Sequence, residues 1–129
     1  MIDIHCHLLP QIDDGSKDTE SSIEQLRLME DGGISKAYFT SHYFRGHYHY
    51  SRDEYDAKLL DFKHAAKTAG FGIEIESGFE VFLQPRIVED INEKSLTMGS
   101  SKYVLIESEL NGLPRSEEHT SELQSRQVI

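Results

Sequence analysis

Four short apolar segments alternate with three segments of helical character over the first 107 residues, and this alternation constrains the fold most strongly. The expected strands are residues 1–7, 34–40, 72–76 and 102–107, and the expected helices are residues 19–31, the stretch between Ser51 and Gly70, and a short helix with Pro85 in its first turn. Strands joined through helices by short connections lie parallel, because each helical crossover returns the chain to the same end of the sheet. The sequence therefore predicts an α/β domain with a parallel sheet or barrel.

Local capping signals support the expected helices. Asp18 is a suitable N-cap for the first helix, with Glu20 in its first turn. Ser51 is followed three residues later by Glu54, which is the pattern of a capping box at the start of the second helix. The predicted buried face of that helix is Tyr55, Leu59, Phe62 and Ala66. Proline at position 85 suits the first turn of the short third helix.

Composition and charge exclude several classes of partner. The chain has 129 residues, enough for one domain or part of one. Its net charge of -10 argues against nucleic-acid binding through a basic patch and against attraction to an anionic membrane, but suits carboxylates clustered around metal cations. Cys6 is the single cysteine, and the sequence shows neither a signal peptide nor an apolar stretch of about 18 residues. We therefore expect a cytoplasmic protein that binds no nucleic acid and does not insert into a membrane.

Side chains that can bind metal ions occur near the ends of all four predicted strands. The spacing of His5 and His7 places both imidazoles on the same side of the first strand. The further candidates are Asp14 in the loop after the first strand, His42 after the second, Glu80 after the third and Glu107 at the end of the fourth. The carboxyl ends of parallel strands form one edge, where functional residues gather. We expect a shared metal site there, although each residue taken alone also suits a capping, core or surface role.

The mixed ligand set indicates a class of chemistry. Imidazole together with carboxylate favours manganese, iron or zinc over calcium or magnesium. Several carboxylates that can bridge favour more than one ion, and paired ions about 3.5–4 Å apart commonly serve the hydrolysis of phosphate esters.

Other residues of the first strand and of the loop after His42 each allow two interpretations. Cys6 could be a phosphatase nucleophile, but the cysteine-based tyrosine phosphatases need an arginine (C-x5-R) where this chain has Ile12, so a small buried thiol is favoured. Arg45 could hold a substrate phosphate or be a surface charge. His47 and His49 could be accessory ligands or solvated loop residues. The aromatic residues of this loop could line a pocket or pack the loop onto the domain: Tyr43, Phe44, Tyr48 and Tyr50.

Residues 115–129 depart from the alternating pattern. Residues 115–125 are polar, have no clear period, and resemble the conceptual translation of a common short-read sequencing adapter. We therefore expect residues 1–114 to be the N-terminal part of the domain and residues 115–129 to be a non-native tail, with the natural reading frame continuing past Pro114.

Four motifs together carry a resemblance to a known family. They are residues 1–15 (MIDIHCHLLPQIDDG), Thr40-Ser41-His42, Gly78-Phe79-Glu80 and residues 103–107 (YVLIE). These motifs resemble the polymerase-and-histidinol-phosphatase (PHP) superfamily, and within it the bacterial metal-dependent protein-tyrosine phosphatases of capsule biosynthesis (CpsB/YwqE-like). The resemblance implies a distorted (β/α)7 barrel, of which this chain holds the N-terminal β-α-β-α-β-α-β portion.

The resemblance also implies a site and a reaction. It implies two or three divalent ions, most often manganese, with His5 and His7 on one ion and Asp14 and His42 on another. It implies Glu80 and Glu107 as carboxylate ligands, with Glu80 bridging. The implied reaction is attack of a metal-bound hydroxide on phosphotyrosine, without a phosphoenzyme. The implied substrate is a bacterial tyrosine kinase that controls capsule or exopolysaccharide synthesis.

The chain departs from the family pattern in two ways. The family usually carries Thr-Pro-His-His where this chain has Thr40-Ser41-His42-Tyr43, and its later ligands, another His and an Asp-x-His pair, lie in a C-terminal half beyond this chain. We therefore expect the 129-residue chain to have an incomplete metal site and little activity. The alternatives are another PHP phosphoesterase such as a histidinol phosphatase, an amidohydrolase, which would need a lysine at a later strand end, and an inactive metal-binding fragment.

Overall fold

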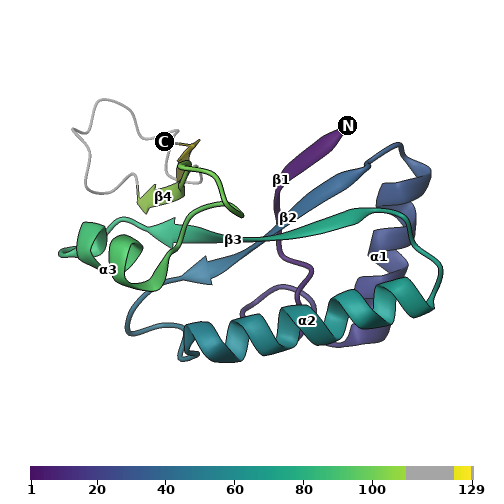
Figure 1. The fold of residues 1–129 in the computed structure, drawn as a ribbon. Coiled ribbons are helices and arrows are strands. Elements are labelled where there is room, and N and C mark those ends of the chain that lie inside the picture. The colour runs from purple at the N-terminus through teal and green to yellow at the C-terminus, as the bar shows by residue number, and fades with distance from the viewer. Residues whose placement is uncertain (110–123, 129) are drawn as a thin grey trace.

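A computed structural model describes residues 1–109 and the backbone of residues 124–128 (Figure 1). The elements follow in the order β1 (Ile2–Cys6), α1 (Thr19–Asp31), β2 (Lys36–Tyr43), α2 (Arg52–Thr68), β3 (Glu74–Phe82), α3 (Ile87–Lys94), β4 (Leu105–Glu109) and β5 (Gln124–Val128). The strands form one sheet in the order β1-β2-β3-β4-β5, and the first four are parallel. The predicted α/β alternation is therefore confirmed. Within the described residues, no helix is both long and apolar enough to cross a membrane.

The two longer helices begin as their capping residues predict. The side chain of Asp18 accepts a hydrogen bond from the Ser21 amide at 2.7 Å. At the start of α2, the Glu54 amide donates to Ser51 Oγ at 3.1 Å and the Ser51 amide donates to Glu54 Oε1 at 3.5 Å, which completes the capping box. The predicted face of α2 is buried as expected: Tyr55, Leu59, Phe62 and Ala66.

The hydrophobic core lies between the sheet and the helices, and α2 runs along one face of the sheet in Figure 1. The Phe39 and Phe62 rings lie 5.3 Å apart, and the Tyr55 and Phe79 rings lie 4.4 Å apart. The buried Tyr55 hydroxyl donates to the Phe39 carbonyl at 2.7 Å and accepts from the Gly78 amide at 3.1 Å. This side chain of α2 therefore links β2 to β3 a few residues before the metal-binding candidates of both strands.

Three strands end later than the sequence predicted. Strand β2 continues to Tyr43 and β3 to Phe82, so His42 and Glu80 lie inside strands and not after them. The two residues are register partners, and the ladder continues because Tyr43 and Val81 still bury their side chains. Strand β4 covers Leu105–Glu109, later than the predicted residues 102–107.

The third helix begins later than predicted. Pro85 precedes α3 instead of forming its first turn, because Arg86 adopts a left-handed conformation (φ 66°) at the N-cap. The helix begins at the buried Ile87.

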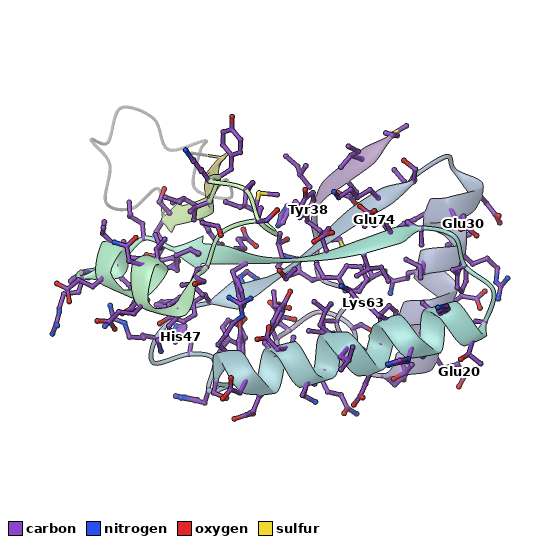
Figure 2. The ribbon with its side chains drawn as sticks, viewed as in Figure 1. Glu20, Glu30, Tyr38, His47, Lys63 and Glu74 are labelled. Carbon is purple, nitrogen blue, oxygen red and sulfur yellow. The ribbon has the colours of Figure 1, made fainter. Side chains whose placement is uncertain are left out.

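The end of the sheet opposite the candidate site is fixed by a carboxylate from α1. Glu30 Oε1 accepts hydrogen bonds from the Gly72 amide at 2.7 Å and the Ile73 amide at 3.0 Å, just before β3 begins. Figure 2 shows Glu30 and Glu74 at this end of the molecule and His47 at the other end, near α3. The carboxyl ends of the parallel strands therefore lie at the end marked by His47.

Strand β5 was not predicted. It pairs antiparallel with β4, from Leu105 opposite Val128 to Glu109 opposite Gln124. An edge strand presents unpaired backbone amides and carbonyls, so any nearby extended segment can pair with it regardless of its side-chain pattern. The separation of residues 115–129 as a non-native tail stays a prediction, and residues 115–123 and 129 lie outside the described part of the chain.

Candidate metal centre

His5 and His7 project to the same side of β1, as the spacing predicted. Their Nε2 atoms lie 3.1 Å apart, and each lies 3.0 Å from Glu80 Oε1. His5 is within β1 and His7 follows it directly. A pair of imidazoles from one strand therefore meets a carboxylate from β3, which lies two strands away in the sheet.

Glu80 lies at the centre of the cluster. Its side chain is 0% exposed, and its Oε1 atom also lies 3.5 Å from His42 Nδ1. Phe79 and Val81 pack into the core, so alternation along β3 places Glu80 on the opposite face of the sheet. One buried carboxylate thus contacts imidazoles from both β1 and β2, the arrangement expected of a bridging ligand.

His42 joins the cluster to Glu107 and to the loop after β1. Its Nδ1 atom lies 3.2 Å from Glu107 Oε2, and its Nε2 atom lies 3.4 Å from Asp14 Oδ1. The imidazole stacks on the Tyr48 ring, with centroids 5.2 Å apart and planes 6° apart, while the Tyr50 hydroxyl donates to the His42 carbonyl. These contacts hold both the ring and the backbone of His42.

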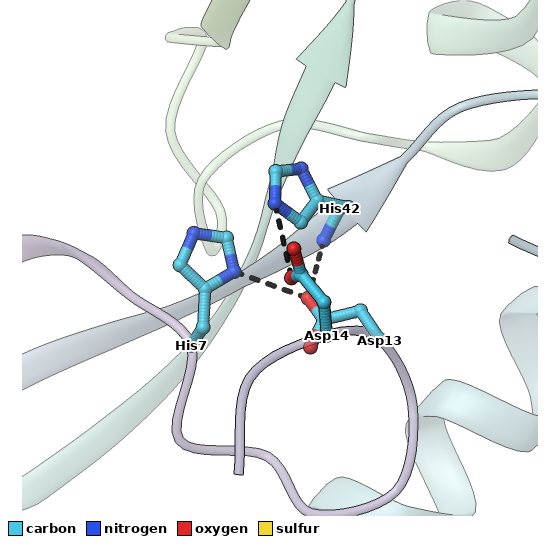
Figure 3. A group of neighbouring side chains, drawn as sticks. All are labelled: His7, Asp13, Asp14 and His42. Carbon is cyan, nitrogen blue, oxygen red and sulfur yellow. Dashed lines mark hydrogen bonds and ion pairs between the residues drawn. The ribbon is translucent and has the colours of Figure 1, made fainter. Parts of the chain in front are cut away.

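Asp13 is the residue that the sequence analysis missed. Its Oδ2 atom lies 3.0 Å from His7 Nδ1 and accepts a hydrogen bond from the His42 amide at 2.9 Å (Figure 3). The Asp13 side chain is 0% exposed, whereas the predicted ligand Asp14 is 67% exposed. A metal-binding imidazole commonly donates its second N–H to a carboxylate, so Asp13 suits the role of orienting His7. The Asp-Asp pair in the sequence was a signal, but it did not show which carboxylate turns inward.

Glycine at position 15 permits the loop that carries both aspartates. A Cβ atom there would lie 2.3 Å from the His7 carbonyl oxygen and 2.6 Å from His7 Cβ. The Gly15 amide donates to Asp13 Oδ1 at 2.9 Å, and the Ser16 amide donates to the His7 carbonyl at 3.1 Å. The backbone of the loop therefore lies directly against His7.

Charge and burial shift the pKa values of two residues in the cluster. Burial by itself lowers the pKa of His7, but hydrogen bonds to Asp13 and Glu80 outweigh it and raise the pKa to about 9. Burial raises the pKa of Asp13, but the hydrogen bonds from His7 and from the His42 and Gly15 amides outweigh it and lower the pKa.

The described residues form three overlapping groups that could each hold a metal ion. Within each group, one ligand atom per residue lies within 4.8 Å of the others: His7, Asp13, Asp14 and His42; His5, His7 and Glu80; and His42, Glu80 and Glu107. All six predicted ligands fall in these groups, and Glu80 belongs to two of them. Imidazoles with buried carboxylates suit Mn, Fe or Zn, so the residues fit the divalent ions that the resemblance implies.

Arg45, for which a substrate contact was one of two predicted roles, is engaged elsewhere. Its Nε atom donates to Asp90 Oδ2 at 2.6 Å, and its guanidinium also donates to the Pro85 carbonyl. Asp90 in turn accepts from the Tyr43 hydroxyl at 2.8 Å. The structure thus ties Arg45 to α3 and does not bring it to the metal groups.

Cys6 matches the interpretation as a structural thiol. Its Sγ atom donates to the Tyr38 carbonyl at 3.4 Å, and burial, assisted by Asp3, raises its pKa to about 12. A thiol of this kind stays protonated and is a poor nucleophile. Of the two loop histidines, His47 lines a cavity beside His42, while His49 is exposed and does not line it.

The fold and the cluster agree with comparisons to known proteins. Residues 1–120 match the family model described as "Capsular polysaccharide synthesis, CpsB/CapC". The chain belongs to the CpsB/CapC family. The family resemblance carried by the sequence motifs is therefore confirmed.

Curated relatives in this family are similar to the chain over less than half of their own length. The putative tyrosine-protein phosphatase CapC of Staphylococcus aureus is 29% identical over 115 residues, covering 88% of this chain and 45% of that protein. The tyrosine-protein phosphatase YwqE of Bacillus subtilis (strain 168) is 29% identical over 123 residues, covering 89% and 46%. The tyrosine-protein phosphatase CpsB of Streptococcus pneumoniae is 30% identical over 108 residues, covering 83% and 44%.

A solved structure confirms the CpsB/CapC fold. It comes from work on YwqE of Bacillus subtilis and CpsB of Streptococcus pneumoniae, described there as metal-dependent tyrosine phosphatases. It matches with a TM-score of 0.80 and 29% identity, covering 89% of this chain and 47% of that chain. The four parallel strands of the present chain, with their alternating helices, thus form a curled half-barrel.

Proposed function

We propose that this protein is a metal-dependent phosphatase that removes phosphate from tyrosine residues of proteins in the cytoplasm. Its proposed substrate is a bacterial tyrosine kinase that controls capsule or exopolysaccharide synthesis. Support comes from the cluster of imidazoles and carboxylates on the strands and from the tyrosine-protein phosphatases CapC, YwqE and CpsB, which are similar to the chain.

The observation that carries the proposal is the position of Glu80. A fully buried carboxylate in contact with His5, His7 and His42 suits a ligand shared by neighbouring cations. Grouping ionisable side chains in the interior of a small domain is costly in stability, and buried clusters of this kind tend to occur at functional sites.

We propose manganese as the ion, with His5, His7 and Glu80 holding one site and Asp14, His42 and Glu107 contributing to its neighbours. Bound ions would polarise a phosphoryl oxygen, activate water and neutralise charge in the transition state. The chain's own residues hold the reacting groups in place: Asp13 orients His7, while Tyr48 and Tyr50 fix His42.

We further propose that the 129-residue chain binds metal but turns over slowly. The chain spans less than half the length of its named relatives, and the three groups offer three or four protein ligands each. Manganese prefers octahedral coordination, so ligands from further sequence would complete the site in a longer product.

The test combines metal counting with a hydrolysis assay. The chain and the product of the continued reading frame are dialysed against Mn²⁺ and analysed by elemental spectrometry, and both are assayed on a phosphotyrosine peptide with and without chelator. Glu80→Gln should lower the metal content of both proteins, while Glu24→Gln on the exposed face of α1 should not.

The outcomes separate the proposal from its alternatives. Manganese-dependent hydrolysis by the longer product supports the phosphatase. Faster turnover of histidinol phosphate than of the peptide would favour another PHP phosphoesterase, and metal binding without turnover in the longer product would favour a binding role. Turnover by the 129-residue chain at the rate of the longer product would refute the incomplete site.

A further inference from the structure

A cavity of about 290 Å³ opens beside the metal groups at the carboxyl end of the sheet. One part of its wall is polar and belongs to the metal groups, with Asp14, His42 and Glu107. Another part is aromatic and includes Phe44 and Phe82. The cavity therefore places a site for metal ions next to an apolar surface. A phosphate ester of an aromatic alcohol would need both environments, one for its phosphoryl group and one for its ring.

Strand alternation explains why the two aromatic rings lie next to the metal ligands. Phe82 lies two residues after Glu80 on β3, and Phe44 lies two residues after His42, directly beyond β2. Residues two apart share a face of the sheet and are about 6.6 Å apart along the strand. Because His42 and Glu80 are register partners, the phenylalanines form the next row toward the carboxyl edge.

Phe44 and Phe82, which form this aromatic row, pack against each other. The Phe44 and Phe82 rings stack with centroids 4.0 Å apart and planes 16° apart, and His47 lies against Phe44 at 3.9 Å. Both phenylalanines are only partly buried, so part of each ring remains open to the cavity. Phe82 is the register partner of Glu107, and both residues line the cavity.

We propose that Phe44 and Phe82 bind the aromatic ring of the substrate and make the site select aryl phosphates over alkyl phosphates. The inference rests on the proposed phosphatase function and adds the residues that set its specificity. With the phosphoryl group held by the ions that Asp14, His42 and Glu107 would bind, the esterified ring would lie against the stacked phenylalanines, where apolar burial and ring contacts favour it. An alkyl group of similar charge makes fewer such contacts.

The test measures binding and does not need turnover. The 129-residue chain, loaded with Mn²⁺, is titrated calorimetrically with phenylphosphonate and with methylphosphonate, which carry the same anionic group. The wild-type chain should bind phenylphosphonate about tenfold more tightly, a difference of about 1.4 kcal/mol. Phe44→Ala and Phe82→Ala should each reduce this preference to about twofold or less while leaving the affinity for methylphosphonate unchanged.

Matched variants separate a ring-binding role from loss of folding. Leu83→Ala removes an exposed apolar side chain next to Phe82 and should keep the full preference. Phe44→Leu keeps an apolar side chain without the ring and should give an intermediate preference. Unchanged methylphosphonate affinity in each variant shows that the metal site is still folded.

The results distinguish failure of this inference from failure of the proposed function. Equal affinity of the wild-type chain for the two phosphonates, or a preference that survives both alanine substitutions, would overturn the aromatic subsite and leave the phosphatase proposal standing. Failure of the Mn²⁺-loaded chain to bind either phosphonate would also overturn the aromatic subsite, whereas the phosphatase proposal falls only if the longer product fails to hydrolyse the phosphotyrosine peptide.

Discussion

Ser41 and Ser22 make a matched pair of buried serines whose replacement by alanine should change stability in opposite directions. Both residues are 0% exposed. Ser22 Oγ lies 2.5 Å from the Leu8 carbonyl oxygen and 2.5 Å from Ser16 Oγ, so its hydroxyl is fully engaged. Among the described side chains, Ser41 Oγ is the buried polar atom without a hydrogen-bond partner.

The magnitudes follow from the two environments. An unpaired hydroxyl in the interior costs about 1–3 kcal/mol, and its removal leaves a void that costs less than about 1 kcal/mol. Ser41→Ala should therefore raise the free energy of unfolding by about 1 kcal/mol. Ser22→Ala removes a satisfied hydrogen bond and should lower it by about 1–2 kcal/mol. For a chain of this size, each kcal/mol shifts Tm by about 3–5 °C.

The assay is urea denaturation followed by circular dichroism, with thermal melting as a second measurement. Interpretation as a change in stability requires equal m values for the two variants and the wild-type chain. If Ser41→Ala destabilised the protein as much as Ser22→Ala, the Ser41 hydroxyl would have to be hydrogen-bonded in solution, and the reasoning from the unpaired atom would be refuted.

Three further substitutions test other parts of the structure. Gly15→Ala should displace His7, because the new Cβ would lie 2.3 Å from the His7 carbonyl oxygen. The expected result is weaker Mn²⁺ binding by calorimetry and a lower Tm. Unchanged binding would contradict the close approach. Asp13→Asn should weaken Mn²⁺ binding about 10–100-fold if the carboxylate orients His7, and an unchanged affinity would remove it from the site. Burial raises the pKa of Asp90, but the hydrogen bonds from Tyr43 and Arg45 outweigh it and lower the pKa in the folded chain. The stabilising contribution of Asp90 is therefore present above the usual Asp pKa and is lost as the pH falls through the lowered folded value. Urea midpoints measured from about pH 6 down to pH 3 should fall less steeply for Asp90→Asn than for the wild-type chain, and parallel curves would contradict the assigned shift.

The sequence was informative where the alternation of a strand determines which way its side chains point. The two-residue spacing predicted that His5 and His7 point together, although β1 ends at Cys6 and its register with β2 shifts between Asp3 and Cys6. Glu80 turns away from the core because Phe79 and Val81 turn toward it. The parallel order of the sheet then brings β1 and β3 to either side of β2, where their ends share one edge.

Loop conformation and strand length were the parts that the sequence did not determine. Asp13 and Asp14 are adjacent carboxylates, and the inward one is selected by a loop in which Gln11 adopts a positive φ of 58° and Gly15 lies against His7. Strands β2 and β3 continue past the polar residues His42 and Glu80. In the sequence a polar residue after an apolar run suggests the end of a strand, because the other side chains that surround it in the fold are not visible there. Strand β5 follows from the open edge of β4 and not from any pattern of its own.

His7 lies between two carboxylates, with Nδ1 toward Asp13 and Nε2 toward Glu80. One imidazole is therefore shared by the loop group (His7, Asp13, Asp14 and His42) and the strand group (His5, His7 and Glu80). A neutral imidazole has a single lone pair for an ion, and the other nitrogen keeps its proton. An ion that fixes the ring in one group therefore changes the affinity of the other group, and thermodynamic reciprocity requires the same factor in both directions. Metal loading of this chain should accordingly follow one coupled isotherm, in which the occupancy of the loop group depends on that of the strand group.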